Sequence, residues 1–225
     1  MNVLLFGATG MVGQGALREC LLADDVSRVL AVGRTETGQS HPKLQELLHG
    51  DLFEYSSVEA QLTGFDACFF CIGVTSSGMD EAQYTRLTYE LTLAAATTLA
   101  RLNPHMTFVY VSGAGADSSE QGKTMWARVR GRTENALRRL PFKAVYILRL
   151  GIIQPLHGIR SKTGSYRVFY ALSGFLLPLL RVLMPNVVLS TEIVGRAMLN
   201  LVRHGASKTV LEAADISPAG RSTTG

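Results

Sequence analysis

Three glycines near the start of the chain, Gly7, Gly10 and Gly13, have a spacing that suits phosphate binding. They follow the apolar run 3–6, which predicts a buried strand, and precede a helical pattern over residues 11–22. A glycine turn between a strand and a helix lets the backbone approach a pyrophosphate, whose charge the helix start favours. The motif, G-x-x-G-x-x-G rather than G-x-G-x-x-G, therefore predicts dinucleotide binding; a purely structural turn is the alternative. The expected contacts here are Gly7, Thr9, Gly10, Met11, Val12 and Gly13.

An arginine follows the second predicted strand, residues 28–33, where dinucleotide folds recognise the adenosine ribose. A carboxylate there would accept hydrogen bonds from the 2′-hydroxyl of NAD, whereas Arg34 suits the 2′-phosphate of NADP. A charge-assisted contact of about 1.5–3 kcal/mol corresponds to roughly ten- to hundredfold in affinity. We expect NADP to be preferred over NAD, although Glu36 is close in sequence and Arg34 could be a solvated turn residue.

Two further strand ends carry candidate contacts. We predict a short helix over 42–48 and a third strand over 48–52, where Asp51 could accept from the adenine amino group or serve as a turn residue. The apolar run 65–72 predicts a strand buried on both faces, and a glycine at its carboxyl end would lie at the ligand crevice. The expected cofactor contacts from these strand ends are Asp51, Leu52, Cys71, Ile72 and Gly73.

Ser112 ends the next predicted strand, residues 106–112, and is the candidate catalytic hydroxyl. A serine at this strand end would lie over the catalytic crevice, although a helix cap or turn is the alternative role. The strand over 142–150 is followed by Gly151 and Ile152, which we expect to border the cofactor.

The order of these elements predicts the fold class. Strands and helices alternate through the first 150 residues, without an internal repeat or a linker. This alternation predicts an α/β fold, a Rossmann-like doubly wound parallel sheet with a small C-terminal substrate-facing region. We expect one domain over residues 1–212, with 154–188 as a substrate or lid region and 213–225 as a flexible tail.

The composition excludes several classes of protein. Residues of hydrophobic type make up 47% of the 225 positions and charged residues 18%, which indicates a globular chain. A net charge of +4 is too small to argue for nucleic-acid binding. Three cysteines without a signal segment predict the reducing cytoplasm. Cys68 and Cys71 form a C-x-x-C inside an apolar strand, where they point to opposite faces, so we expect neither a metal nor a redox role.

Residues 175–184 form the most apolar window, but it is too short to span a bilayer and contains Pro178 and Arg181. A lid, a dimer face or a core helix is therefore expected rather than membrane contact. The second half of the predicted helix over 80–101 is rich in small apolar residues, which would allow a homodimer to pair there.

Motifs at successive strand ends resemble those of the atypical short-chain dehydrogenase/reductases. They are GATGMVG from Gly7, VGR from Val32, DL from Asp51, CIGVT from Cys71, VSGAGAD from Val111 and LRLG from Leu148. Within this group the chain is similar to Tat-interacting oxidoreductase-like proteins and to chains labelled NAD-dependent epimerase/dehydratase. The resemblance covers about residues 1–212 and implies an NAD(P)-binding Rossmann fold, without indicating the reaction.

The chain departs from this family where the family keeps its acid–base pair. Active members carry Tyr-x-x-x-Lys on the helix after the fifth strand, with both side chains on one helix face. The predicted helix over 120–140 has no tyrosine and only Lys123; the best-fitting pair is Trp126 and Arg130. Tryptophan has no ionisable oxygen, whereas Arg130 can still bind ribose or phosphate.

Three interpretations remain open. The protein could be an oxidoreductase or epimerase/dehydratase that uses another acid, such as Ser112, Tyr84, Tyr166 or a water. It could be a redox sensor or regulatory protein that binds NADP(H) without turnover. A distant tyrosine, Tyr166 or Tyr170, could also replace the missing one. The segment 154–185 is mostly apolar, so a hydrophobic small-molecule substrate or a protein partner is conceivable; a scaffold without a ligand is a further class.

Overall fold

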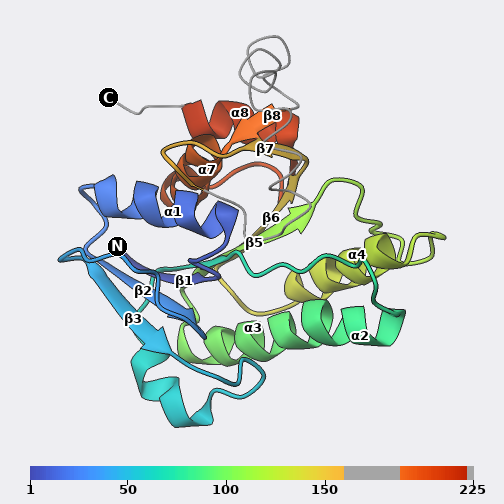
Figure 1. Cartoon of the computed structure of the whole chain (residues 1–225), viewed down its shortest axis with the longest axis horizontal. Helices are drawn as coiled ribbons and strands as arrows, with labels where there is room; N and C mark the ends of the chain where they lie inside the picture. Colours follow the sequence, from blue (N-terminus) through green and yellow to red (C-terminus); the bar gives the residue numbers. More distant parts are fainter. Residues whose placement is uncertain (160–187, 222–225) are drawn as a thin grey trace.

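The computed structural model describes residues 1–159 and 188–221 of the chain. Its main sheet has seven strands in the order β3-β2-β1-β4-β5-β6-β9, and every neighbouring pair is parallel (Figure 1). These strands are β1 (Asn2–Phe6), β2 (Arg28–Gly33), β3 (Leu44–Leu48), β4 (Ala67–Phe70), β5 (Thr107–Gly113), β6 (Ala144–Leu150) and β9 (Val210–Glu212). The order reverses between β1 and β4, which makes this the topological switch point where such sheets bind ligands.

Helices cover both faces of the sheet, as a doubly wound fold requires. On one side lie α1 (Met11–Leu22), α7 (Thr191–His204) and α8 (Ala213–Arg221) (Figure 1). On the other lie α2 (Glu81–Thr85), α3 (Leu91–Leu102) and α4 (Met125–Leu137), with a π-helical turn, η2 (Arg86–Glu90), joining α2 to α3. A 3₁₀ helix, η1 (Ser56–Leu62), precedes β4. The predicted Rossmann-like fold is therefore confirmed.

The side chains of β1 show how the two layers are built. Val3 and Leu5 belong to the apolar cluster under α1 and α7, whereas Leu4 and Phe6 belong to the cluster under α3. Successive side chains of a strand point to opposite faces, so one continuous apolar run supplies both cores. The strand is buried throughout from Val3 and holds the glycine turn that follows it in a rigid position.

A second, two-stranded sheet follows β6. It pairs β7 (Ile152–Gln154) in parallel with β8 (Val188–Ser190). Ser190 caps α7 by accepting a hydrogen bond from the backbone N–H of Ile193 at 3.2 Å. The segment 160–187, with Tyr166, Tyr170 and the apolar window, lies outside the described residues.

Two local predictions are wrong. Residues 42–48 do not form a helix and 48–52 do not form a strand; β3 occupies Leu44–Leu48 instead. The leucines in this segment have helix-like spacing, but β3 is the edge strand and only Leu47 is buried, so pairing with β2 decides the conformation. The helix expected over 120–140 begins only at Met125.

The expected flexible tail over 213–225 also differs from the structure. Residues 213–221 form α8, where Ile216 and Ser217 are buried. The Nδ2 group of Asn200 on α7 donates to the carbonyl of Ala219 at 2.8 Å. Packing against α7 orders a polar segment that has no helix signal of its own; residues 222–225 lie outside the described part. In the described residues no helix is long and apolar enough to cross a membrane.

Candidate functional site

The glycine turn after β1 leaves no space for side chains. A Cβ on Gly13 would lie 2.0 Å from the carbonyl oxygen of Gly7, and a Cβ on Gly7 would lie 2.8 Å from the backbone carbon of Cys71. Gly7 also has a φ of 76°, a conformation that favours glycine. The turn therefore brings the start of α1 close to the ends of both β1 and β4.

The start of α1 is open to a ligand. Gly10 is its N-cap residue and supplies no side-chain hydrogen bond, and the first turn of the helix contains no acidic residue. The first N–H groups of a helix have no partner within the helix, so here they remain available to an anion. A Cβ on Gly10 would lie 3.3 Å from the Gly7 carbonyl oxygen, so a larger side chain would crowd this position.

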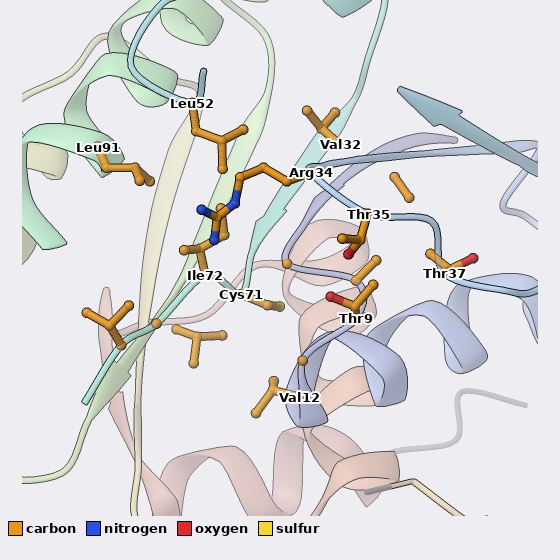
Figure 2. A pocket seen from close by; sticks show the side chains of 18 of the residues that line it. Thr9, Val12, Val32, Arg34, Thr35, Thr37, Leu52, Cys71, Ile72 and Leu91 are labelled. Carbon is orange, nitrogen blue, oxygen red and sulfur yellow. The ribbon is translucent and has the colours of Figure 1, made fainter. Parts of the chain in front are cut away.

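A pocket of about 810 Å³ lies in front of this helix start, a size typical of small-molecule sites. It extends from the glycine turn over the carboxyl ends of β2 and β4 to the helices beyond (Figure 2). The predicted contact residues that line it are Gly7, Thr9, Gly10, Met11, Val12, Arg34, Leu52, Cys71, Ile72 and Gly73.

Other predicted contacts lie elsewhere. Gly13 packs beneath the turn rather than lining the pocket. Asp51 accepts a hydrogen bond from the backbone N–H of Phe53 at 2.9 Å, which is the turn role that its sequence position left open. Gly151 and Ile152 do not line the pocket, because β6 is separated from the β1–β4 crevice by β5. Among the described residues no cluster of metal-ligating side chains is found.

The end of the pocket beside β2 and β3 carries both signs of charge. The side chain of Arg34 extends toward Leu52 and Ile72 (Figure 2). Thr37 and Glu46 also line the pocket, and the Glu46 carboxylate accepts from the Thr37 backbone N–H at 2.7 Å. The sequence did not reveal Glu46 as a lining residue, because its segment was predicted to be a helix. Leu87 on η2 and Leu91 on α3 also line the pocket, and they were missed because the π turn has no clear sequence signal.

Arg130 lies between the carboxyl ends of β4 and β5. Its Nη2 atom is 3.9 Å from the position of a Cβ on Gly73, and its Cδ atom is 3.8 Å from that of Gly113. Its Nε group donates to the hydroxyl of Tyr84 at 3.0 Å. Burial opposes the charge, but the neighbouring phenols of Tyr110 and Tyr84 leave the pKa of Arg130 above its usual value, so the side chain is a permanent cation.

Trp126 lies one turn before Arg130 on α4, as the motif spacing predicts. Its ring lies 3.4 Å from the position of a Cβ on Gly115, in the loop after β5. Gly115 has a φ of 88°, so glycine suits this loop both for its backbone and for its space. The tryptophan thus packs over the loop where the resemblance implies a tyrosine hydroxyl.

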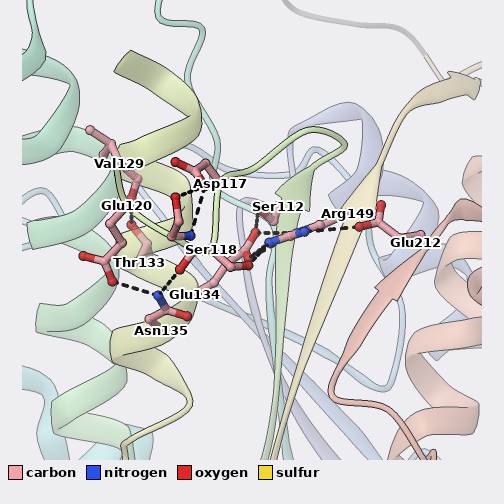
Figure 3. Close-up of polar contacts among 11 residues, drawn as sticks. Ser112, Asp117, Ser118, Glu120, Val129, Thr133, Glu134, Asn135, Arg149 and Glu212 are labelled. Carbon is pink, nitrogen blue, oxygen red and sulfur yellow. Dashed lines mark hydrogen bonds and ion pairs between the residues drawn. The ribbon is translucent and has the colours of Figure 1, made fainter. Parts of the chain in front are cut away.

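Ser112 is buried and does not line the pocket. Its hydroxyl donates to a carboxylate oxygen of Glu134 at 2.5 Å (Figure 3). Glu134 is itself 1% exposed and accepts from Arg149 on β6, at 2.6 Å from Nη2 and 3.1 Å from Nε. The candidate catalytic serine is therefore part of a buried ion-pair network, which is neither the turn role nor the helix-cap role considered from sequence.

Comparisons with known proteins agree with this geometry. A family model described as NAD(P)H-binding matches residues 7–140. The protein fmp52, mitochondrial, of Emericella nidulans is 31% identical over 159 residues, covering 68% of this chain and 66% of that protein. FMP52, mitochondrial, of Saccharomyces cerevisiae is 30% identical over 167 residues, covering 72% and 69%. The chain thus spans about two thirds of the length of these relatives.

Solved structures support the fold. The Bordetella bronchiseptica enzyme WbmF in complex with NAD⁺ superposes with a TM-score of 0.68 at 15% identity, covering 96% of this chain and 76% of that one. The predicted resemblance to NAD(P)-binding short-chain dehydrogenase/reductases is confirmed.

The prediction of a cytoplasmic protein is wrong, because the curated relatives are named as mitochondrial. Cysteines without disulfides indicate a reducing compartment, but they do not show which reducing compartment it is.

Proposed function

Because this chain belongs to the NAD(P)H-binding family, we propose that it binds NADP(H) in the pocket at the carboxyl ends of β1, β2 and β4. The observation that carries the proposal is the uncapped start of α1, which faces this pocket across the glycine turn. An anionic pyrophosphate there would receive backbone N–H groups and the favourable end of the helix dipole. A Cβ on Gly10 would lie 3.3 Å from the Gly7 carbonyl oxygen, so a larger side chain would crowd the turn.

The remaining parts of the dinucleotide follow from the pocket lining. Leu52 and Ile72 offer an apolar site for adenine beside the Arg34 guanidinium. Gly73 lines the other end, beyond the pyrophosphate position, where the second ribose would bind. Arg130 does not line the pocket itself, but its Nη2 atom lies 3.9 Å from the position of a Cβ on Gly73. Ten predicted contacts surround one pocket, which supports this placement.

NADP is our preferred cofactor over NAD, on the charge of Arg34. A guanidinium can pair with the 2′-phosphate in a bidentate manner. Glu46 opposes this preference, because its carboxylate lies in the same end of the pocket and would repel a phosphate. Thr37 already donates its backbone N–H to Glu46, which holds the carboxylate on the wall of the pocket.

We propose an oxidoreductase or an epimerase/dehydratase-like enzyme as the first function. A bound nicotinamide supplies the exchange of a hydride with the substrate. The protein binds and orients that group, while Trp126 packs over the loop after β5 and cannot exchange a proton. The proton then comes from water or from a tyrosine of the segment outside the described residues, where Tyr166 and Tyr170 are the candidates. The apolar character of 154–185 favours a hydrophobic substrate.

A redox sensor that binds NADP(H) without turnover is the second candidate. The observation in its favour is that neither β5 nor α4 offers a free acid to the site. Ser112 is bonded to Glu134 in the core, and Trp126 replaces the family's tyrosine.

The names of the relatives further suggest a mitochondrial location for this protein.

Calorimetric titration with NADPH and, separately, NADH tests the proposal. We expect tight binding of NADPH and much weaker binding of NADH. Equal binding would remove Arg34 from the cofactor site, and binding of neither would leave the glycine turn with a structural role only. Incubation of NADPH with a panel of carbonyl compounds then separates an oxidoreductase from a sensor, since only the oxidoreductase would oxidise NADPH. An epimerase or dehydratase returns the hydride to its substrate, so it is recognised by product formation without net oxidation of the cofactor.

A further inference from the structure

Tyr84 and Arg130 come from two different helices and meet beside the inner end of the pocket. Tyr84 lies on α2 and is 1% exposed, and its hydroxyl accepts from the Nε group of Arg130 on α4 at 3.0 Å. The two helices lie side by side on the same face of the sheet (Figure 1). This contact joins residues that are 46 positions apart in the chain.

The contact fixes the orientation of the guanidinium relative to Gly73 in the pocket wall. A guanidinium is planar, so fixing its Nε edge also fixes the direction of its two terminal nitrogens. The plane lies against Gly113, with Cδ, Nε and Cζ 3.8–3.9 Å from the position of a Cβ there. Nη2 is 3.9 Å from the corresponding position at Gly73, which lines the pocket.

We propose that Tyr84 is a positioning residue that holds the terminal nitrogens of Arg130 toward the second ribose of the bound dinucleotide. This inference rests on the proposed function. A free arginine side chain has many rotamers, so a partner that holds it in place lowers the entropy lost on ligand binding. Tyr84 itself is too deeply buried to contact a ligand and acts through Arg130.

The arrangement differs from the acid–base pair that the resemblance implies. There a tyrosine and a lysine share one helix, and the tyrosine exchanges a proton with the substrate. Here the tyrosine belongs to α2 and its oxygen accepts from the cation, so the pair has a binding role. Since α4 carries Trp126 in place of the tyrosine, the orientation of Arg130 has to come from another element.

Two ligands, one with and one without the second ribose, test this role. Both carry the 2′-phosphate of NADP: 2′-phospho-ADP-ribose contains the second ribose and 2′-phospho-ADP lacks it, so a change in the ratio of their dissociation constants between the unaltered protein and a variant reports contacts to that sugar. In Tyr84→Phe we expect 2′-phospho-ADP-ribose to bind about three- to tenfold more weakly, as for loss of one hydrogen-bonded partner, and 2′-phospho-ADP to bind unchanged. Because both ligands are titrated into the same protein, a general loss of stability would not change the ratio.

Tyr89→Phe is the matched control. Tyr89 also lies beside an arginine of α4, since the Arg132 guanidinium is 4.2 Å from its ring centroid. The substitution removes a hydroxyl from the same helical segment without touching Arg130, so we expect no change in either ligand. In an Arg130→Gln background, Tyr84→Phe should cause no further loss, because the residue it positions is gone.

Three results with the variants would overturn the inference. Tyr84→Phe could weaken the binding of both ligands equally or weaken the binding of neither. It could also cause the same loss of affinity in the Arg130→Gln background as in the unaltered protein. If the unaltered protein binds neither these two ligands nor NADPH, the proposed function fails as well, and this outcome is distinguishable from the other three. Binding of NADPH but of neither fragment would overturn the inference, because the contacts to the second ribose would then not act on that sugar alone.

Discussion

Ser112 on β5 donates its hydroxyl to the Glu134 carboxylate on α4 at 2.5 Å, within the core and away from the pocket (Figure 3). The same carboxylate accepts from the Arg149 guanidinium on β6, which also contacts Glu212 on β9. One buried anion therefore joins α4 to β5 and β6, and Arg149 extends the network to β9. The serine near the end of β5 lies in this network rather than in the crevice.

Glu134→Ala should destabilise the fold by about 3–5 kcal/mol, because it leaves the mostly buried Arg149 without its main partner. Ser112→Ala removes one hydrogen bond and should cost about 0.5–1.5 kcal/mol. Urea unfolding measures both values. Glu212→Ala is the control, since Glu212 is 50% exposed and its ion pair should contribute at most about 1 kcal/mol. A Glu134→Ala protein as stable as Glu212→Ala would contradict a structural role for the network.

Two glycine substitutions should separate binding from folding. Gly10 has a φ of −77°, which any residue adopts, so Gly10→Val should fold but lose dinucleotide binding. Gly13→Ala should lower the unfolding temperature as well, because its Cβ would lie 2.0 Å from the Gly7 carbonyl oxygen. Thermal unfolding and calorimetric titration measure the two effects. A folded Gly10→Val protein that binds NADPH normally would show that the pyrophosphate does not lie at this helix start.

Arg34 and Glu46 should act in opposite directions on cofactor preference. Arg34→Gln should weaken NADPH about ten- to hundredfold and change NADH little. Glu46→Gln removes the negative charge but keeps an acceptor for the Thr37 N–H, so NADPH should bind about fivefold more tightly, as expected for about 1 kcal/mol of repulsion between solvated charges. Competition titrations measure both. Equal effects on the two cofactors would place these side chains away from the 2′ position.

Two thiols with raised pKa values, the buried Cys68 and the partly buried Cys71 of the pocket wall, should make the protein less stable at alkaline pH. Burial raises the pKa of Cys71 from 9.0 to about 12, and burial raises that of Cys68 well above its usual value. Above about pH 9 the unfolded chain loses these protons while the folded chain keeps them, so the unfolding free energy should fall with rising pH. In this range each thiol lowers the unfolding free energy by about 1.4 kcal/mol per pH unit.

Urea unfolding under reducing conditions, at several pH values from neutral to about 11, measures this slope. Cys71→Ala should reduce the slope by one proton's share and leave the remaining slope in place. An unchanged slope in this variant would mean that the Cys71 thiol ionises equally in the folded and unfolded chains.

Much of the fold could be predicted from local patterns. The apolar run of β1 and the spacing of Gly7, Gly10 and Gly13 act through backbone geometry and period-two alternation, which need no knowledge of distant residues. The predictions of secondary structure were wrong where the local sequence signals were weak. β3 is an edge strand with little burial, and α8 depends on contacts with α7, so pairing and packing overrode the sequence pattern there.

The sequence by itself determined the strand–turn–helix geometry of the pocket, because a glycine turn and a buried strand are properties of neighbouring residues. Only the tertiary structure decided which distant side chains meet. It placed Glu46 beside Thr37, bonded Ser112 to Glu134, and set Tyr84 against Arg130. Such meetings depend on strand order, register and the rotation of packed helices, and these follow from the burial of the whole chain rather than from the spacing of any one motif.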